Sequence, residues 1–230
     1  MEESGLKARS TKDIDIILVV EAISSDFIQA FWRFVKDGNY NRKEVSDDER
    51  QYYRFMDPEF IDFPYQLELF SRNPNIIDRD ADTHLRPIPV NDDLSSLSAI
   101  LMDDGMYEFI MKHSEVVENI HRAKTEALIV LKAKAYLEIS ARIEQGVKED
   151  SKNLKKHKND VFKLAMLLTS EDRFELPESI KEVVVEFLKM VNDNLPTADV
   201  FKATGMKGAT GDQAFNAIKE VFKLKEQDLE

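Results

Sequence analysis

The run Asp13-Ile14-Asp15-Ile16-Ile17-Leu18-Val19-Val20 constrains the fold most strongly, because two carboxylates open an otherwise apolar segment. A short, β-branched apolar run of this kind is typical of a buried strand. Alternate side chains of a strand share a face, so Asp13 and Asp15 lie on one face, about 7 Å apart. Two like charges there repel each other and resist desolvation. A divalent cation bound by both carboxylates offsets their repulsion and desolvation, since paired carboxylates with space for water and phosphate oxygens commonly hold Mg²⁺.

A solvated strand end is the alternative interpretation of Asp13 and Asp15, because acid-x-acid triplets arise by chance in a chain this rich in acidic residues. The setting favours the functional interpretation. Arg9-Ser10-Thr11 precedes the pair and an apolar stretch follows it.

The composition excludes several classes of protein. The chain has no cysteine, which excludes disulfides, thiolate metal sites and cysteine nucleophiles. An apolar fraction of 43% is that of a globular protein, and Asp15 interrupts an apolar run already too short to cross a bilayer. Glu2 and Glu3 stand where a signal peptide would carry basic residues. We therefore predict a cytoplasmic protein with no membrane partner.

A net charge of −12 argues against broad binding to nucleic acids. One local cluster has the opposite sign and contains Lys148, Lys152, Lys155, Lys156, His157 and Lys158. A solvated helix face explains such a cluster in most proteins, and a contact with a phosphate backbone is the alternative.

The order of the predicted elements favours an α+β fold. Strands are predicted over 13–20, 52–56, 65–70 and 97–102, with a long polar loop over 72–93. Helices are predicted from Ser24, Ser25 or Asp26 to Gly38, and over 123–146, 158–168, 180–191 and 213–223. This pattern predicts an α/β core over residues 1–122 and a helical region over 123–230. Phe27, Phe31, Trp32 and Phe34 are expected in the core.

Glu68 is the candidate for a third carboxylate. It lies between apolar residues in Gln66-Leu67-Glu68-Leu69-Phe70, on a predicted strand that can neighbour the first. Phosphoryl transfer with two metal ions needs such a cluster to bridge the attacking and leaving oxygens. A solvent-facing residue on a one-sided sheet is the alternative.

These residues resemble the nucleotidyltransferase superfamily, the fold shared by DNA polymerase beta and the bacterial abortive-infection toxin nucleotidyltransferases. The residues from Gly5 to Leu18 are similar to that family's first strand. The resemblance implies a small mixed sheet in which Asp13, Asp15 and Glu68 bind Mg²⁺ or Mn²⁺ and carry catalysis. It implies contacts of Arg9 and Ser10 with the nucleotide. The implied reaction transfers a nucleoside monophosphate from a nucleoside triphosphate to an RNA end, a protein hydroxyl or a small molecule, and the toxin branch implies an antitoxin partner.

The helical half carries a second resemblance. Residues 128–135 resemble the family's lysine-bearing helix, and residues 155–161 its closing Lys-Asp-x-x-Asp-Ile segment, with His157 where an acid is common. The resemblance implies that Lys132 faces the triphosphate and that Asp160 orients this lysine or fixes the helix. Lys134 is an equally spaced alternative to Lys132.

One departure from the family concerns phosphate binding. The family places a Gly-Gly or Gly-Ser pair at a helix start about fifteen residues before the first aspartate, where backbone N–H groups hold phosphate. Only Gly5-Leu6 matches the end of that segment. Either the chain begins downstream of the true start or the phosphate cradle is lost. The second case leads to the alternative function, an inactive nucleotidyltransferase-fold interaction module, and a plain α+β scaffold is a third possibility. The histidines at 84, 113, 121 and 157 show no metal spacing, and surface or capping roles are expected.

Overall fold

A computed structural model describes residues 13–18, 25–42, 51–71, 88–89, 104–118, 120–147 and 151–229. These residues form two compact units. The first, called the sheet unit, contains the described residues from 13 to 89. The second, called the helical unit, contains those from 104 to 229. The predicted division between residues 122 and 123 therefore falls inside the helical unit, which includes an additional helix and a hairpin at its start.

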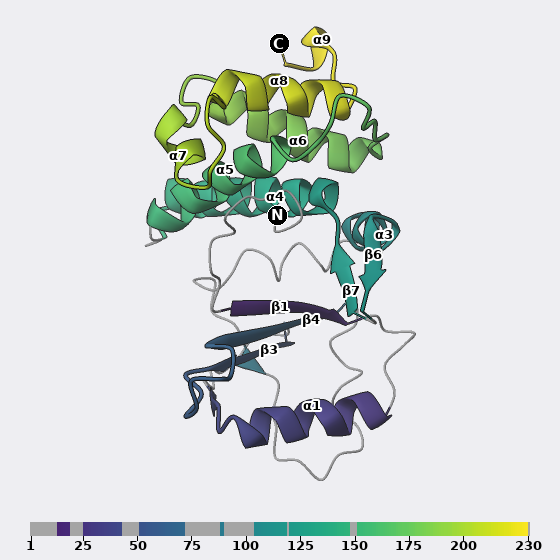
Figure 1. The fold of residues 1–230 in the computed structure, drawn as a ribbon, viewed down its shortest axis with the longest axis vertical. Coiled ribbons are helices and arrows are strands. Elements are labelled where there is room, and N and C mark those ends of the chain that lie inside the picture. Colours follow the sequence, from purple (N-terminus) through teal and green to yellow (C-terminus); the bar gives the residue numbers. More distant parts are fainter. Residues whose placement is uncertain are drawn as a thin grey trace. The chain divides into compact units, whose positions relative to one another are not determined.

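The sheet unit consists of a mixed sheet and one long helix (Figure 1). Its elements are β1 (Asp13–Leu18), α1 (Ser25–Asp37), β2 (Asn41–Arg42), β3 (Gln51–Met56), β4 (Gln66–Ser71) and β5 (Ile88–Pro89). The strand order is β1-β4-β3-β2, with β5 also paired to β3. β1 and β4 are parallel, and the other pairs are antiparallel.

The core of the sheet unit lies between α1 and one face of the sheet. Val35, Tyr40, Phe55 and Leu67 are buried there, and Ile16, Phe31 and Phe63 pack against them. The expected core position of Phe31 is thus confirmed. Phe34 differs, since 40% of its surface is exposed while its ring packs against Phe63 at 4.9 Å. The side chains of Phe27 and Trp32 lie outside the described residues.

Gly38 ends α1 as predicted, and a side chain cannot be added there without a clash. A Cβ atom would lie 2.6 Å from Tyr40 Cε2 and 2.7 Å from Phe63 Cδ1. The next residue, Asn39, has φ of 46°, a conformation that asparagine tolerates better than most residues. The chain thus reverses tightly, and Tyr40 folds back onto the core.

The helical unit is built around one long buried helix (Figure 1). Its elements are α3 (Asp104–Lys112), β6 (Ser114–Val117), β7 (Ile120–Ala123), α4 (Thr125–Glu144), α5 (Ser151–Ala165), α6 (Glu178–Val191), α7 (Ala198–Lys202), α8 (Gly211–Val221) and α9 (Glu226–Leu229). α4 packs against both α5 and α6, and α5 also packs against α8. Consecutive residues Ile129, Val130 and Leu131 are all buried, because neighbours cover α4 on more than one side.

The predicted α+β class is confirmed, and most predicted elements agree with the structure to within a few residues. α8 begins at the predicted turn, where Thr210 and Gln213 form a capping box. Several elements differ: the helices α3, α7 and α9 were not predicted, and α5 and the β6–β7 hairpin also depart from the prediction. α5 begins at Ser151 and not at residue 158. Its lysine-rich first half has no apolar periodicity, so the sequence pattern did not reveal it. The β6–β7 hairpin was not predicted, since its strands are short and Val116 and Ile120 are exposed. The strand predicted over 97–102 and most of the loop over 72–93 lie outside the described residues.

Candidate functional site

The sheet register makes the predicted carboxylate positions neighbours. Asp15 in β1 is the direct register partner of Glu68 in β4, and Asp13 is the partner of Gln66. Glu68 is in turn paired with Arg54 in β3. Adjacent strands lie about 4.8 Å apart, so the backbone brings the second and third predicted carboxylates to facing positions on neighbouring strands.

The same register assigns these positions to one face of the sheet. Ile16, Leu67 and Phe55 pack in the core beneath α1. Because alternate residues of a strand belong to opposite faces, positions 13, 15 and 68 lie on the other face, together with position 54. Asp15 is exposed, and the side chains of Asp13, Glu68 and Arg54 lie outside the described residues.

Like charges at facing positions of neighbouring strands destabilise a sheet, and either a bound cation or a basic neighbour such as the residue at position 54 offsets this cost. Carboxylate oxygens are the ligands that Mg²⁺ prefers, so the donor set at positions 13, 15 and 68 fits this ion. Among the side chains that the structure describes, no group of three or more His, Cys, Asp or Glu residues is arranged to hold a metal. That finding does not include Asp13 and Glu68, so the metal site stays a prediction. Arg9 and Ser10 also lie outside the described residues.

The helical unit brings Lys132 and Asp160 together. Lys132 Nζ on α4 lies 3.9 Å from Asp160 Oδ2 on α5, and both side chains are largely buried. Lys163 Nζ lies 3.9 Å from the other oxygen of the same carboxylate. Lys134, the alternative to Lys132, instead pairs with Glu138 one turn along its own helix, at 3.4 Å. Of the two candidate lysines, Lys132 is therefore the one that lies beside Asp160.

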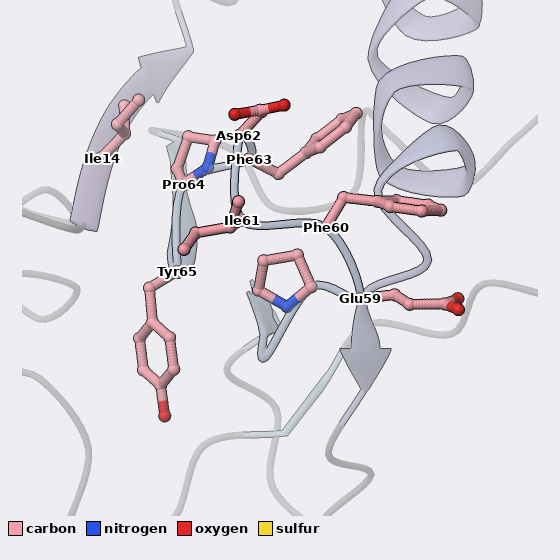
Figure 2. A pocket seen from close by; sticks show the side chains of 9 residues that line it. Ile14, Glu59, Phe60, Ile61, Asp62, Phe63, Pro64 and Tyr65 are labelled. Atoms are coloured by element: carbon pink, nitrogen blue, oxygen red, sulfur yellow. The ribbon is translucent and has the colours of Figure 1, made fainter.

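A pocket of ≈ 580 Å³ lies between Ile14 of β1 and the loop that joins β3 to β4 (Figure 2). Phe60, Ile61 and Tyr65 line it and are substantially exposed, with Ile61 98% exposed. In Figure 2 the ring of Tyr65 points away from the rings of Phe60 and Phe63. Since Ile14 lies between Asp13 and Asp15 in the strand, the pocket borders the opposite face from the carboxylate positions. In the sequence, this pocket could have been suspected from the apolar residues Phe60, Ile61 and Phe63 in a short loop between Pro58 and Pro64.

The loop that forms this pocket is held by several hydrogen bonds. Tyr40 Oη donates to the carbonyl oxygen of Pro64 at 2.6 Å, and the Glu59 backbone N–H donates to the Gly38 carbonyl at 2.9 Å. Asn39 Nδ2 also donates to the Glu59 carboxylate at 2.7 Å. Burial raises the pKa of the Tyr40 phenol, so it stays protonated and able to donate. These bonds fix the loop to the end of α1.

Two residues differ from their predicted surface roles. His113 is partly buried, and its Nδ1 lies 3.0 Å from Oε1 of Glu126, a buried carboxylate at the start of α4. Its ring also lies 4.4 Å from Phe109, so this histidine joins α3 to α4. Lys158 belongs to the predicted lysine cluster but is buried, and its Nζ donates to the Asn194 carbonyl at 2.7 Å. His121 is exposed, as expected.

No family model, curated protein or solved structure matches this chain. Within the described part of the chain, each helix is too short or too polar to cross a bilayer.

Proposed function

We propose that the protein is a nucleotidyltransferase that transfers a nucleoside monophosphate from a nucleoside triphosphate with the help of Mg²⁺ or Mn²⁺. The observation that carries this proposal is the register pairing of Asp15 with Glu68 on the sheet face that also contains position 13. Three carboxylate positions on two parallel strands supply the hard oxygen ligands that the reaction's metal ions need.

The proposed roles follow from the chemistry of each group. Asp13 and Asp15 bind metal, and Glu68 completes the metal site or accepts the proton of the attacking hydroxyl. The bound metal neutralises charge that develops on the transferred phosphate. Lys132 contacts the triphosphate, and Asp160, which lies 3.9 Å from it, keeps the lysine oriented. Arg9 and Ser10 contact the nucleotide.

The cytoplasmic location, the antitoxin partner and the choice among RNA, protein and small-molecule acceptors belong to the same proposal. The antitoxin partner and the acceptors rest on the family resemblance alone, whereas the cytoplasmic location rests on the composition and on the short apolar run described above.

The second candidate function is an inactive nucleotidyltransferase-fold binding module. The exposed pocket of Phe60, Ile61 and Tyr65 favours it, because apolar side chains gathered at a surface commonly mark an interaction site. In this alternative the pocket contacts a partner protein and the carboxylates do no chemistry.

Thermal unfolding in the presence of each of the four ribonucleoside triphosphates, with and without Mg²⁺ or Mn²⁺, tests the proposal. A ligand that binds only the folded state raises the melting temperature. We expect metal-dependent stabilisation of the wild type and its loss in the Asp13→Asn, Asp15→Asn double variant and in Glu68→Gln. Release of pyrophosphate from the stabilising nucleotide is the activity readout.

The matched control is the Asp37→Asn, Asp57→Asn double variant, which removes two exposed carboxylates of the same unit. Asparagine also tolerates the φ of 51° at position 57. The control should keep the stabilisation. No stabilisation of the wild type by any nucleotide and metal would favour the binding module, and equal stabilisation of all variants would place the site elsewhere.

A further inference from the structure

α5 carries an unusual charge for this acidic chain. Its fifteen residues contain five lysines and one carboxylate, Asp160, whereas the whole chain has a net charge of −12. Lys158 is buried and bonded to Asn194, so it does not contribute to the surface. The remaining lysines are Lys152, Lys155, Lys156 and Lys163, and we call them the lysine stripe.

The helical spacing places the lysine stripe on one side of α5. At 3.6 residues per turn, these four residues cover about 100° of the helix circumference, and Lys152 and Lys163 lie about 16 Å apart along the axis. Val161 and Ala165, on the opposite side, are fully buried against the rest of the helical unit. Lys152 and Lys155 are exposed, Lys156 is half-buried, and Lys163 is held against Asp160.

We propose that the lysine stripe binds the phosphate backbone of single-stranded RNA. The ammonium groups of Lys152, Lys155 and Lys156, whose positions span about 6 Å of the helix axis, can contact neighbouring phosphates, and this charge complementarity supplies most of the affinity of sequence-independent binding. Asn159 lies within the stripe, and its amide can both donate to and accept from a ribose 2′-hydroxyl, which distinguishes RNA from DNA.

Other polyanions fit the stripe less well. Insertion of α5 into a membrane interface requires apolar side chains beside the basic ones, and Val161, Phe162 and Leu164 of α5 are buried. Protein interfaces are depleted in lysine and enriched in aromatic residues, and the exposed side of α5 has none of the latter. The net charge of −12 repels every nucleic acid at long range, but most strongly a long duplex, which carries more charge per unit length than a short flexible strand that can follow a single helix.

This inference names RNA as the acceptor class of the proposed transfer, and in that respect it rests on the proposed function. RNA binding itself requires neither the metal nor the carboxylates. Binding can therefore succeed or fail independently of the transfer reaction.

Fluorescence anisotropy with a labelled twelve-nucleotide RNA of mixed sequence, measured from 50 to 300 mM salt without metal or nucleotide, tests the proposal. For a single strand, each phosphate contact contributes about −0.7 to the slope of log affinity against log salt. We expect the Lys152→Gln, Lys155→Gln, Lys156→Gln triple variant to make this slope shallower by about 2 and to weaken binding at least tenfold. Glutamine has a helix propensity close to that of lysine, and circular dichroism checks that α5 is retained.

Two controls separate the stripe from charge in general. Lys158→Met removes a lysine from the buried side of the same helix, and Lys202→Gln, Lys207→Gln, Lys225→Gln removes three exposed lysines elsewhere in the helical unit. Both should bind RNA nearly as the wild type does. Absence of RNA binding at 50 mM salt, or equal binding by the stripe variant, would overturn the proposal. Equal binding of a DNA strand of the same sequence, or preferential binding of phosphatidylserine vesicles, would overturn the assignment to RNA.

Discussion

Lys132 Nζ on α4 lies 3.9 Å from Asp160 Oδ2 on α5, joining the two residues to which the family resemblance assigns the triphosphate contact and its orientation. The exposed fractions of the two side chains are 25% and 17%. Lys134, two residues further along α4, pairs within its own helix. The two lysines are equivalent in the sequence, and only the packing of α4 on α5 distinguishes their surroundings.

A double-mutant cycle with Lys132→Met and Asp160→Asn should give a coupling free energy of about 0.5 kcal/mol, because a partly solvated ion pair at 3.9 Å is weak. Urea unfolding of the wild type, both single variants and the double variant measures it. The matched cycle with Lys134→Met and Glu138→Gln should give less, since lysine preceding glutamate at this spacing is the less favourable order. A larger coupling in the control cycle would contradict this ranking.

The free energy of unfolding should increase with pH because of the buried Lys158. Burial lowers the pKa of Lys158 below its usual 10.5, and the charge of Lys155 lowers this pKa further. Between the lowered pKa and 10.5 the unfolded chain binds more protons at this site than the folded chain, so the free energy of unfolding rises with pH.

Urea unfolding between pH 7 and 10.5 should therefore show wild type gaining stability relative to Lys158→Met. In Lys155→Met the gain should be smaller, because one cause of the shift is removed. A difference between wild type and Lys158→Met that does not change with pH would show that Lys158 is equally easy to charge in both states.

Lowering the pH should detach α9 from α6. Asp228 accepts a hydrogen bond from Lys181 Nζ at 2.6 Å and from the Lys225 backbone N–H at 2.7 Å, and these lower the pKa of its carboxyl below 3.8. Because the folded-state pKa is lowered, the carboxylate stabilises the docked helix above pH 3.8, and this contribution is lost as pH falls through the folded-state pKa.

Amide hydrogen exchange of residues 226–229 measures this release. Asp228→Asn should raise the exchange rate even at neutral pH. Asp212→Asn, an exposed carboxylate on α8, should leave it unchanged. Equal protection of α9 in Asp228→Asn and wild type would mean that this ion pair does not hold the helix.

Gly38→Ala should destabilise the sheet unit by about 1–3 kcal/mol, since the added methyl meets two aromatic rings at under 3 Å and they must shift. The Gly38 carbonyl also accepts the hydrogen bond of the Glu59 backbone N–H, so the pocket loop should become more mobile. Chemical denaturation followed through the fluorescence of Trp32, the single tryptophan of the sequence and part of α1, checks the stability. Gly146→Ala is a poor steric control, because the φ of 82° at position 146 strains any side chain. Ala30→Gly, at an exposed site in α1, is preferable and should lower the free energy of unfolding by about 1 kcal/mol or less.

Local elements could be predicted because their signals lie within a few residues of one another. The alternation at Asp13 to Leu18 predicted β1, apolar spacing and Gly38 predicted α1, and Thr210 predicted the start of α8. The first half of α5 and the β6–β7 hairpin were missed because many of their side chains are exposed or half-buried, so burial imposes little periodic pattern on them, whereas α3 was missed although its apolar side chains are buried.

That Asp13 and Asp15 share one face of a strand follows from residue order alone, because it depends on the geometry of a single extended segment. Three other relationships arise only when the elements pack: Asp15 is the register partner of Glu68, Lys132 and not Lys134 meets Asp160, and Lys158 is buried away from the rest of its cluster. Each of these joins residues far apart in the chain. Their pairing depends on how whole faces of helices and strands bury their apolar side chains, which no short stretch of sequence specifies.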